Sequence, residues 1–275
     1  MSHTQAKSIT GAAVFLMLVA VFAAPAFGTS IAPPLNSAGS FTMLGGTISN
    51  TGDSVVTGNV GATGTITGFP PGTATGTVSS PVTAAYNDFV SAYTYASTET
   101  ATQTNVGLAA NETFDGNTVY SLGGASVTST AGIELTFDAQ GDSSEVFVLQ
   151  TPGALTIDGP LTFNLTDGAL ASNIYWIVGA AATINPSGPD VIWDGNILAQ
   201  TSFTMSANPS QAFSGTINGC VFAETANTLA AATDVTGCSS LASSTPEPGS
   251  AGLAALGCLL GALYMRRRRL IVSRM

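Results

Sequence analysis

The stretch from Phe27 to Met265 contains no lysine, arginine or histidine. The basic residues and the one histidine all lie outside it, at His3, Lys7, Arg266, Arg267, Arg268, Arg269 and Arg274. A Ser-His-Asp or Cys-His site needs an imidazole, and phosphoryl or oxyanion chemistry is normally assisted by a cation. Histidine is also the commonest ligand of transition metals. The sequence therefore predicts a protein that is not an enzyme and that has no cofactor and no metal centre.

Acidic residues dominate the charge of this region. Fifteen of the sixteen Asp and Glu residues lie between Phe27 and Thr245, which gives that part a formal charge of −15. A field of this sign repels phosphate backbones and excludes nucleic acid as a partner. Carboxylates such as Asp138, Asp142 and Glu145 could act as a glycosidase pair or bind calcium. Because they lie in a Gly-containing segment, we interpret them as turn residues, with calcium binding as the alternative.

The N-terminus has the pattern of a secretory signal peptide. Lys7 precedes an apolar run from Ile9 to Phe22, and Ala24-Pro25-Ala26 follows. A positive residue, a short apolar run and a small-x-small site are typical of such a signal. We predict a signal peptide over residues 1–26 and a linker over residues 27–40. Cleavage after Gly28 and an uncleaved anchor are the alternatives.

The C-terminus has the pattern of a membrane-spanning segment. Residues 249–265 are uncharged and apolar, and the cluster Arg266, Arg267, Arg268 and Arg269 follows directly. Such a cluster stays on the cytoplasmic side of a membrane. We therefore predict a linker over 239–248, a transmembrane helix over 249–265 and a basic cytoplasmic tail over 266–275.

Pro246-Glu247-Pro248, followed by this apolar segment and the arginine cluster, resembles the PEP-CTERM sorting signal, although Thr245 stands where that signal often has Val. The resemblance implies an exosortase-type processing enzyme as a partner. It also implies an exported protein that starts as an inner-membrane anchored precursor and ends at the cell surface or secreted. A plain single-span anchor is the alternative.

Two of the three cysteines lie outside these terminal segments. Cys258 falls in the predicted membrane helix, which leaves Cys220 and Cys238. In an oxidising compartment we expect them to form a disulfide worth about 3 kcal/mol. Two buried free thiols are the alternative.

Residues 41–238 are predicted to form one mainly β domain. Short β-branched runs interrupted by glycine are typical of many short strands. One segment differs, because Val82, Ala85, Phe89, Ala92 and Ala96 recur at helical spacing after Ser80-Pro81. We predict one long amphipathic helix over about residues 81–102, with Ser80 as its N-cap.

A repeat in this domain predicts a β-solenoid, with a β-sandwich as the alternative. Leu155-Thr156-Ile157, Ala182-Thr183-Ile184, Phe203-Thr204-Met205 and Asn227-Thr228-Leu229 end four similar segments, and Leu135-Thr136-Phe137 resembles an earlier copy. Units of this size bury their apolar side by stacking on one another. In a strand the central threonine of each triplet points away from the core, so stacked coils would form a threonine ladder. Thr201 beside Thr225 and Ser202 beside Ala226 would widen it.

Several blocks resemble the microbial ice-binding (antifreeze) protein family. They include Gly46-Thr47-Ile48-Ser49-Asn50, Val56-Thr57-Gly58-Asn59-Val60-Gly61, Asn173-Ile174-Tyr175-Trp176 and Gly195-Asn196-Ile197-Leu198-Ala199. The resemblance implies an irregular right-handed β-helix with the long α-helix packed alongside. Some members carry Thr-Ala/Gly-x-Thr/Asn on the face that meets ice, and here Thr225-Ala226-Asn227-Thr228 fits.

These patterns predict an extracellular protein that adsorbs to ice or ordered water through a flat threonine-rich face. The predicted face consists of Thr156, Thr183, Thr201, Thr204, Thr225 and Thr228. Threonine suits this role because its stiff side chain holds a hydroxyl and a methyl in place. The alternative is a non-enzymatic structural or adhesive protein that contacts extracellular polysaccharide.

Overall fold

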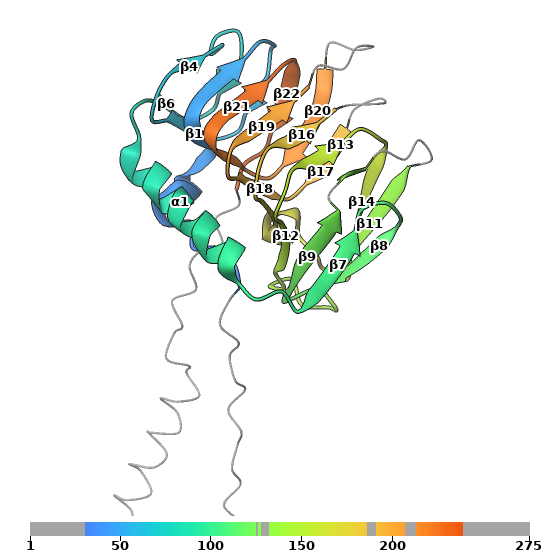
Figure 1. The fold of residues 1–275 in the computed structure, drawn as a ribbon. Helices are drawn as coiled ribbons and strands as arrows, with labels where there is room; N and C mark the ends of the chain where they lie inside the picture. Colours follow the sequence, from blue (N-terminus) through green and yellow to red (C-terminus); the bar gives the residue numbers. More distant parts are fainter. Residues whose placement is uncertain (1–30, 125, 128–131, 186–190, 207–212, 239–275) are drawn as a thin grey trace, which may run out of the picture.

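The computed structural model describes residues 31–124, 126–127, 132–185, 191–206 and 213–238. They form stacked coils of parallel strands with one long α-helix along the side (Figure 1). This confirms the predicted β-solenoid with a helix packed alongside, while its right-handedness stays a prediction. Among the described residues no helix is long and apolar enough to cross a bilayer. The predicted signal peptide, Pro-Glu-Pro linker, membrane helix and basic tail lie outside the described residues.

The coils have three faces. The first, covered by the helix, contains β7 (Gln103–Gly107), β9 (Thr118–Gly124), β12 (Phe147–Thr151), β15 (Ile174–Val178), β18 (Asn196–Ala199), β3 (Asn59–Ala62) and β6 (Val78–Ser79). The second, here called the ladder face, contains β10 (Ser126–Val127), β13 (Leu155–Ile157), β16 (Ala182–Ile184), β19 (Ser202–Met205) and β4 (Ile66–Thr67). Two long strands, β1 (Phe41–Asn50) and β21 (Val221–Leu229), run through both of these faces.

The third face consists of two separate sheets. One contains β8 (Glu112–Asp115), β11 (Ile133–Asp138) and β14 (Leu161–Thr166). The other contains β17 (Val191–Asp194), β20 (Phe213–Asn218), β22 (Ala232–Val235), β2 (Val55–Val56) and β5 (Thr73–Ala74). A short 3₁₀ helix, η2 (Ala171–Asn173), precedes β15. Leu135-Thr136-Phe137, which resembles an earlier copy of the segment ends Leu155-Thr156-Ile157 and Ala182-Thr183-Ile184, lies in β11 on this third face and not on the face of those triplets.

Helix α1 (Thr83–Thr98) is shorter at both ends than the predicted range 81–102. Ser80 does not cap it, because the Ser80 hydroxyl donates to the Gly64 carbonyl and the Val82 N–H donates to the Ala62 carbonyl of a neighbouring coil. At the other end the Gln150 side-chain amide donates to the carbonyls of Ala96 at 2.6 Å and Glu99 at 2.9 Å. These contacts satisfy two of the carbonyls at the C-terminal end of the helix, which have no partner within it.

The apolar face of α1 packs on the first face of the solenoid. Ala85, Phe89, Ala92, Tyr93 and Ala96 are its buried residues, four of which the helical spacing had predicted. All of these except Ala92 join outward-facing strand residues such as Tyr175 and Phe222 in one cluster. The segment Asn36–Ser40, expected to be part of a linker, instead forms a 3₁₀ helix, η1. Asp88 of α1 accepts hydrogen bonds from the Ser37 N–H and hydroxyl, which ties this segment to the helix.

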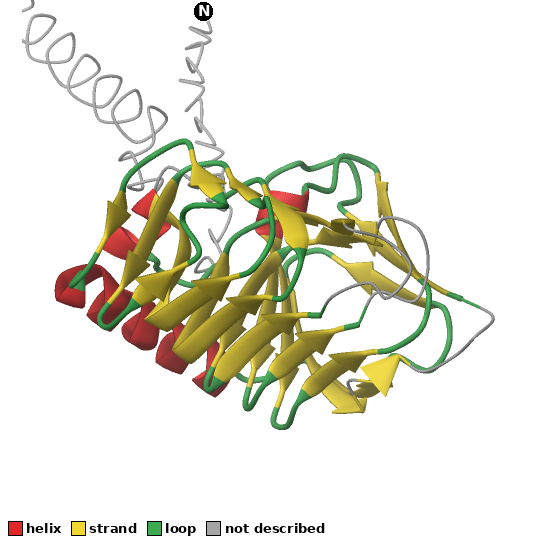
Figure 2. Ribbon diagram, turned by 90° about the horizontal axis from the view of Figure 1, so that it is seen from above, coloured by secondary structure: helices red, strands yellow, loops and turns green. Residues whose placement is uncertain are grey.

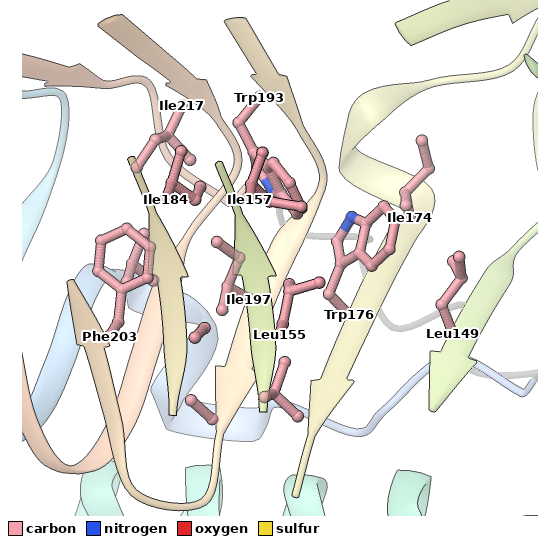
Figure 3. Packing of buried hydrophobic residues seen from close by; sticks show 14 of the residues in the cluster. Leu149, Leu155, Ile157, Ile174, Trp176, Ile184, Trp193, Ile197, Phe203 and Ile217 are labelled. Atoms are coloured by element: carbon pink, nitrogen blue, oxygen red, sulfur yellow. The ribbon is translucent and has the colours of Figure 1, made fainter. Parts of the chain in front are cut away.

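The interior of the coils holds a second apolar cluster. Residues that alternate with the outward threonines point inward, as period-2 geometry requires. Figure 3 shows Leu155, Ile157, Ile184 and Phe203 in one cluster with Trp176, Trp193 and Ile217 from the other faces. The packed interior therefore fixes the outward direction of the residue between each pair.

The N-terminal strand β1 lies beside the C-terminal strand β21. Ser49 pairs with Thr228 although the two residues are 179 positions apart. On its other side β1 pairs with β3 and β4. The chain thus starts at one end of the stack, returns along α1 to the far end, and builds coils back toward its own beginning (Figure 1).

The predicted disulfide between Cys220 and Cys238 is present, with a Cα–Cα distance of 4.8 Å. Cys220 occupies the position that Asn196 has one coil earlier, where the Asn196 amide donates to the Ser172 and Ile174 carbonyls and its oxygen accepts from the Cys220 N–H. Cys238 lies beside the Phe41 carbonyl at the start of β1. The bridge therefore closes the last coil at the junction with the first.

We predict that Cys238→Ser lowers the free energy of unfolding by about 3 kcal/mol, because the open chain regains the entropy of a loop of this size. Thermal or denaturant unfolding of oxidised protein measures the loss. Wild-type protein under reducing conditions should show the same loss, and the variant should show none on reduction. An unchanged unfolding midpoint in the variant would contradict this role.

Candidate functional site

The central column of the ladder face is a row of hydroxyl side chains in register. Thr156 pairs with Thr183, Thr183 with Thr204, and Thr204 with Thr228. The row then crosses onto the N-terminal strands, where Thr228 pairs with Ser49 and Ser49 with Thr67. We call these six residues the hydroxyl ladder. Strand spacing places successive hydroxyls about 4.8 Å apart along the stack.

A second outward column lies two residues before the ladder on each strand, on the same side of the sheet. We call it the flanking column; its members are Ala154, Ala181, Ser202, Ala226, Thr47 and Thr65. Ser202 pairs with Ala226, as predicted, and Ala226 pairs with Thr47. The alanine, serine and threonine side chains of this column are small, so the column does not rise above the ladder. The two columns together form a surface without large side chains.

A third column, two residues after the ladder, is tied together by hydrogen bonds. The Asn185 amide donates to the Asp158 carboxylate, and the Ser206 hydroxyl donates to the Asn185 side-chain oxygen at 2.5 Å. Further along, the Thr51 hydroxyl donates to the Ala230 carbonyl at 2.6 Å. These bonds hold one border of the face rigidly.

Thr201 and Thr225 lie side by side at the other border. The Thr225 N–H donates to the Thr201 carbonyl at 2.6 Å, and both side chains are exposed. The motif Thr225-Ala226-Asn227-Thr228 thus crosses the corner, but Asn227 points into the core with no exposed surface. The six predicted residues therefore lie on or beside one face.

The structure adds Thr47, Ser49, Thr65 and Thr67 to this face, which the sequence repeat did not include. Thr47 and Ser49 belong to β1, Thr67 belongs to β4, and Thr65 directly precedes β4. All four lie outside the four aligned segments. Their signal was the pattern Thr-Ile-Ser and Thr-Ile-Thr, in which one apolar residue stands between two hydroxyl residues. The apolar–Thr–apolar rule misses this pattern because position 49 is a serine followed by the buried polar Asn50, and Thr67 is followed by Gly68.

Two features let β1 approach β21 closely enough for this register. A Cβ on Gly46 would lie 2.5 Å from the Thr225 carbonyl oxygen and 2.6 Å from that of Glu224, so only glycine fits. The Asn227 side-chain amide donates to the Leu44 carbonyl at 2.9 Å, where the register between the strands shifts. Close approach of the two backbones and one buried side-chain amide thus form the junction of β1 with β21.

Acidic side chains lie mainly away from the ladder face. Six are on strands of the third face: Glu112, Asp115, Glu134, Asp138, Asp194 and Asp234. In the three columns of the ladder face Asp158 is the acid that the described residues contribute. The face is therefore nearly uncharged in a strongly acidic domain.

The acids weighed as a catalytic pair or calcium site make local turn contacts. Asp142 accepts hydrogen bonds from the Ser144 N–H and hydroxyl, which lower the pKa of Asp142, and Asp138 accepts from the Gln140 N–H. Burial, with Asp142 nearby, raises the pKa of Glu145. Among the described residues no group of three His, Cys, Asp or Glu side chains could hold a metal ion.

A cleft of about 230 Å³ lies between α1 and the first face. It is lined by residues including Tyr93, Ser97, Ser121, Gln150 and Gln200, and none of its lining side chains is charged. The Gln150 amide is already used to end the helix. The cleft thus brings together neither an acid with a base nor a nucleophile with either.

A parallel solenoid with a level, hydroxyl-lined and nearly uncharged face has the features of a protein that binds an extended surface. The family model for ice-binding-like proteins matches residues 43–236, and the chain belongs to this family. Its sequence is 34% identical over 184 residues to an ice-binding protein of Nostoc sp., covering 62% of this chain. It is 35% identical over 102 residues to an ice-binding protein of Flavobacterium frigoris, covering 37% of this chain.

These two alignments span 64% and 34% of the length of those relatives, which is less than two thirds in each case. The fold also matches the crystal structure of an ice-binding protein from the Antarctic ascomycete Antarctomyces psychrotrophicus. That match has a TM-score of 0.63 and 33% identity, and it covers 75% of this chain and 98% of the other. The shared architecture therefore extends over nearly all of that protein.

Glu224, at the corner between the helix-covered and ladder faces, gives a pH-dependent prediction. Burial raises its pKa from the ordinary value of 4.5, and burial together with Glu224 raises the pKa values of Tyr86 and Tyr93. Because the pKa of Glu224 is raised in the folded state, the protonated carboxyl favours the folded protein at low pH. This contribution to the free energy of unfolding is lost as pH rises through the folded pKa. We expect Glu224→Gln to raise the unfolding temperature at about pH 7 and to leave it unchanged at about pH 3.

Thermal unfolding of the wild type and Glu224→Gln at both pH values measures this difference. Asp53→Gln, at an exposed acid between β1 and β2, serves as the control for the loss of one negative charge. A Glu224→Gln effect that is equal at both pH values would contradict the assignment.

Proposed function

We propose that this protein binds ice through the ladder face. The observation that carries the proposal is the register of Thr156, Thr183, Thr204 and Thr228 with Ser49 and Thr67 along one sheet. Stiff threonine side chains hold hydroxyls and methyls at regular spacing. Charged groups, which would hold water of their own, are nearly absent from this surface. Membership of the ice-binding-like family and the ice-binding relatives support the same function.

The ligand in this proposal is an ordered water surface, and the protein does no chemistry on it. The absence of Lys, Arg and His from Phe27 to Met265 supports a non-enzymatic role. The alternative ligand is extracellular polysaccharide. If the purified protein stays in the liquid during slow freezing, it does not bind ice and this alternative is favoured.

Export is part of the proposal. The disulfide between Cys220 and Cys238 supports an oxidising compartment, in agreement with the signal-peptide pattern of residues 1–26. We further propose that Pro246-Glu247-Pro248 and the arginine cluster serve exosortase-type processing of a membrane-anchored precursor. The order of these features along the sequence supports that step.

We expect Thr204→Tyr to abolish most thermal hysteresis and incorporation into ice, because a phenol ring in the middle of the ladder would hold the surface away from ice. The matched control is Thr162→Tyr, an exposed strand residue of the third face. Thermal hysteresis and ice-affinity partition of both variants, with circular dichroism to confirm folding, make the measurement. Loss of activity in the control but not in Thr204→Tyr would place the ice contact on another face.

A further inference from the structure

The hydroxyl content of the ladder face is uneven along the stack. On β13 and β16 the ladder threonines stand beside alanines of the flanking column, Ala154 and Ala181. On β19 both positions carry hydroxyls, as Ser202 and Thr204. The same is true of β1 and β4, here called the N-terminal rungs, where Thr47 stands beside Ser49 and Thr65 beside Thr67.

The paired positions lie close together in space although they are far apart in sequence. In stack order, β19 pairs with β21, β21 with β1, and β1 with β4. Rungs are about 4.8 Å apart and the two columns about 6.7 Å apart, since alternate residues of a strand share a side. Three of these four rungs, β19, β1 and β4, carry hydroxyls in both columns, and β21 between them has Ala226 in the flanking column. On β13 and β16, by contrast, both flanking positions are alanine.

Availability of these hydroxyls for water also favours the N-terminal rungs. Thr47, Thr65 and Thr67 are exposed, while Thr156 and Thr183 are only partly so. The hydroxyls of Thr65 and Thr67 have no hydrogen-bond partner among the described residues, and neither do those of Thr156 and Thr183, so exposure is what distinguishes the two ends. The Ser49 hydroxyl donates to the Thr228 hydroxyl at 3.4 Å. The Thr47 hydroxyl makes one long contact of 3.3 Å, to the Thr225 carbonyl. These groups are thus oriented by the sheet and remain free to bind water.

The two ends of the ladder face also differ in charge, because a carboxylate lies at the β13 end. Asp158 immediately follows β13 in the border column, and its carboxylate is exposed. On β19, β21 and β1 that column holds Ser206, Ala230 and Thr51. A carboxylate holds its own hydration shell and disturbs an ordered water layer beside it. Within the three columns the charge of the described residues therefore lies at the β13 end, away from the rungs with hydroxyls in both columns. Glu224 of β21 lies outside these columns, at the corner with the helix-covered face.

We propose that the ice contact is centred on this composite patch of β19, β21, β1 and β4, with Thr47, Ser49, Thr65 and Thr67 as its main N-terminal residues. The threonines of β13 and β16 extend the face but contribute less. The inference rests on the proposed function and specifies which part of the surface performs it. It makes binding depend on the docking of β1 against β21, because neither chain end holds the patch alone.

The test compares Ser49→Tyr with Thr156→Tyr in the purified protein. Both positions are in the same column, both are partly exposed, and both have a paired strand on each side. Both variants place a ring on the ladder face and should lower thermal hysteresis, but we expect Ser49→Tyr to lose several-fold more than Thr156→Tyr, because its ring lies inside the composite patch. Unfolding temperatures confirm that each variant is folded.

A gain-of-function variant tests the same inference if Ser49→Tyr fails to fold. The triple variant Ala154→Thr, Ala181→Thr, Asp158→Asn extends the second hydroxyl column to β13 and β16 and removes the charge. It should raise thermal hysteresis above wild type, and the single variant Asp158→Asn controls for charge alone.

The outcomes separate the inference from the proposed function. If wild-type protein shows neither hysteresis nor incorporation into ice, the proposed function fails. If wild type is active but Thr156→Tyr loses as much as Ser49→Tyr, or the triple variant gains nothing, the face acts uniformly and the composite patch is wrong.

Discussion

The parallel pairing of β1 with β21 is the interaction on which the rest of the structure depends. Without it, β21 would present a free edge at the end of the last coil, and exposed edges of this kind are prone to unwanted pairing. The N-terminal strands cover that edge and bring their own coil into the stack. Gly46 permits the close approach, and the Asn227 amide satisfies the Leu44 carbonyl where the register shifts. The disulfide then closes the last coil beside the start of β1.

This closure allows opposite faces of the same coils to have different chemistry. The first face is apolar on its outside because α1 covers it, as seen from above in Figure 2. The third face carries most of the strand acids, which keep an apolar-rich domain soluble. The ladder face needs neither a cover nor charge, since threonine, serine and alanine are small and weakly polar. Segregation of charge thus leaves one level surface that is nearly uncharged.

The elements with a local signal were predictable from the sequence. Helical spacing identified the buried side of α1, and repeated apolar–Thr–apolar triplets identified the register of Thr156, Thr183, Thr204 and Thr228. The triplet at Thr136 failed because β11 has the same alternation on a different face. Alternation shows which residues point inward but not to which face a strand belongs.

The rest depends on contacts between distant parts of the chain. The pairing of Ser49 with Thr228 leaves no periodic signal, and Asn50, as a buried polar residue, hides the triplet pattern. Its amide donates to the Gly52 and Gly68 carbonyls, a role visible only once the neighbouring coil is placed. The start of α1 was misjudged for a similar reason, because Ser80 bonds to Gly64 in another coil rather than to the helix.

Amide hydrogen exchange across β1 tests the central claim most directly, because the Thr51 N–H donates to Leu229 and the neighbouring amides lie within the β21–β1–β4 sheet. If β1 is an integral part of the solenoid, peptides covering residues 41–51 will exchange as slowly as those covering β18 and β21. Fast exchange in β1 beside a protected β21 would show that β1 and β21 do not form one continuous face.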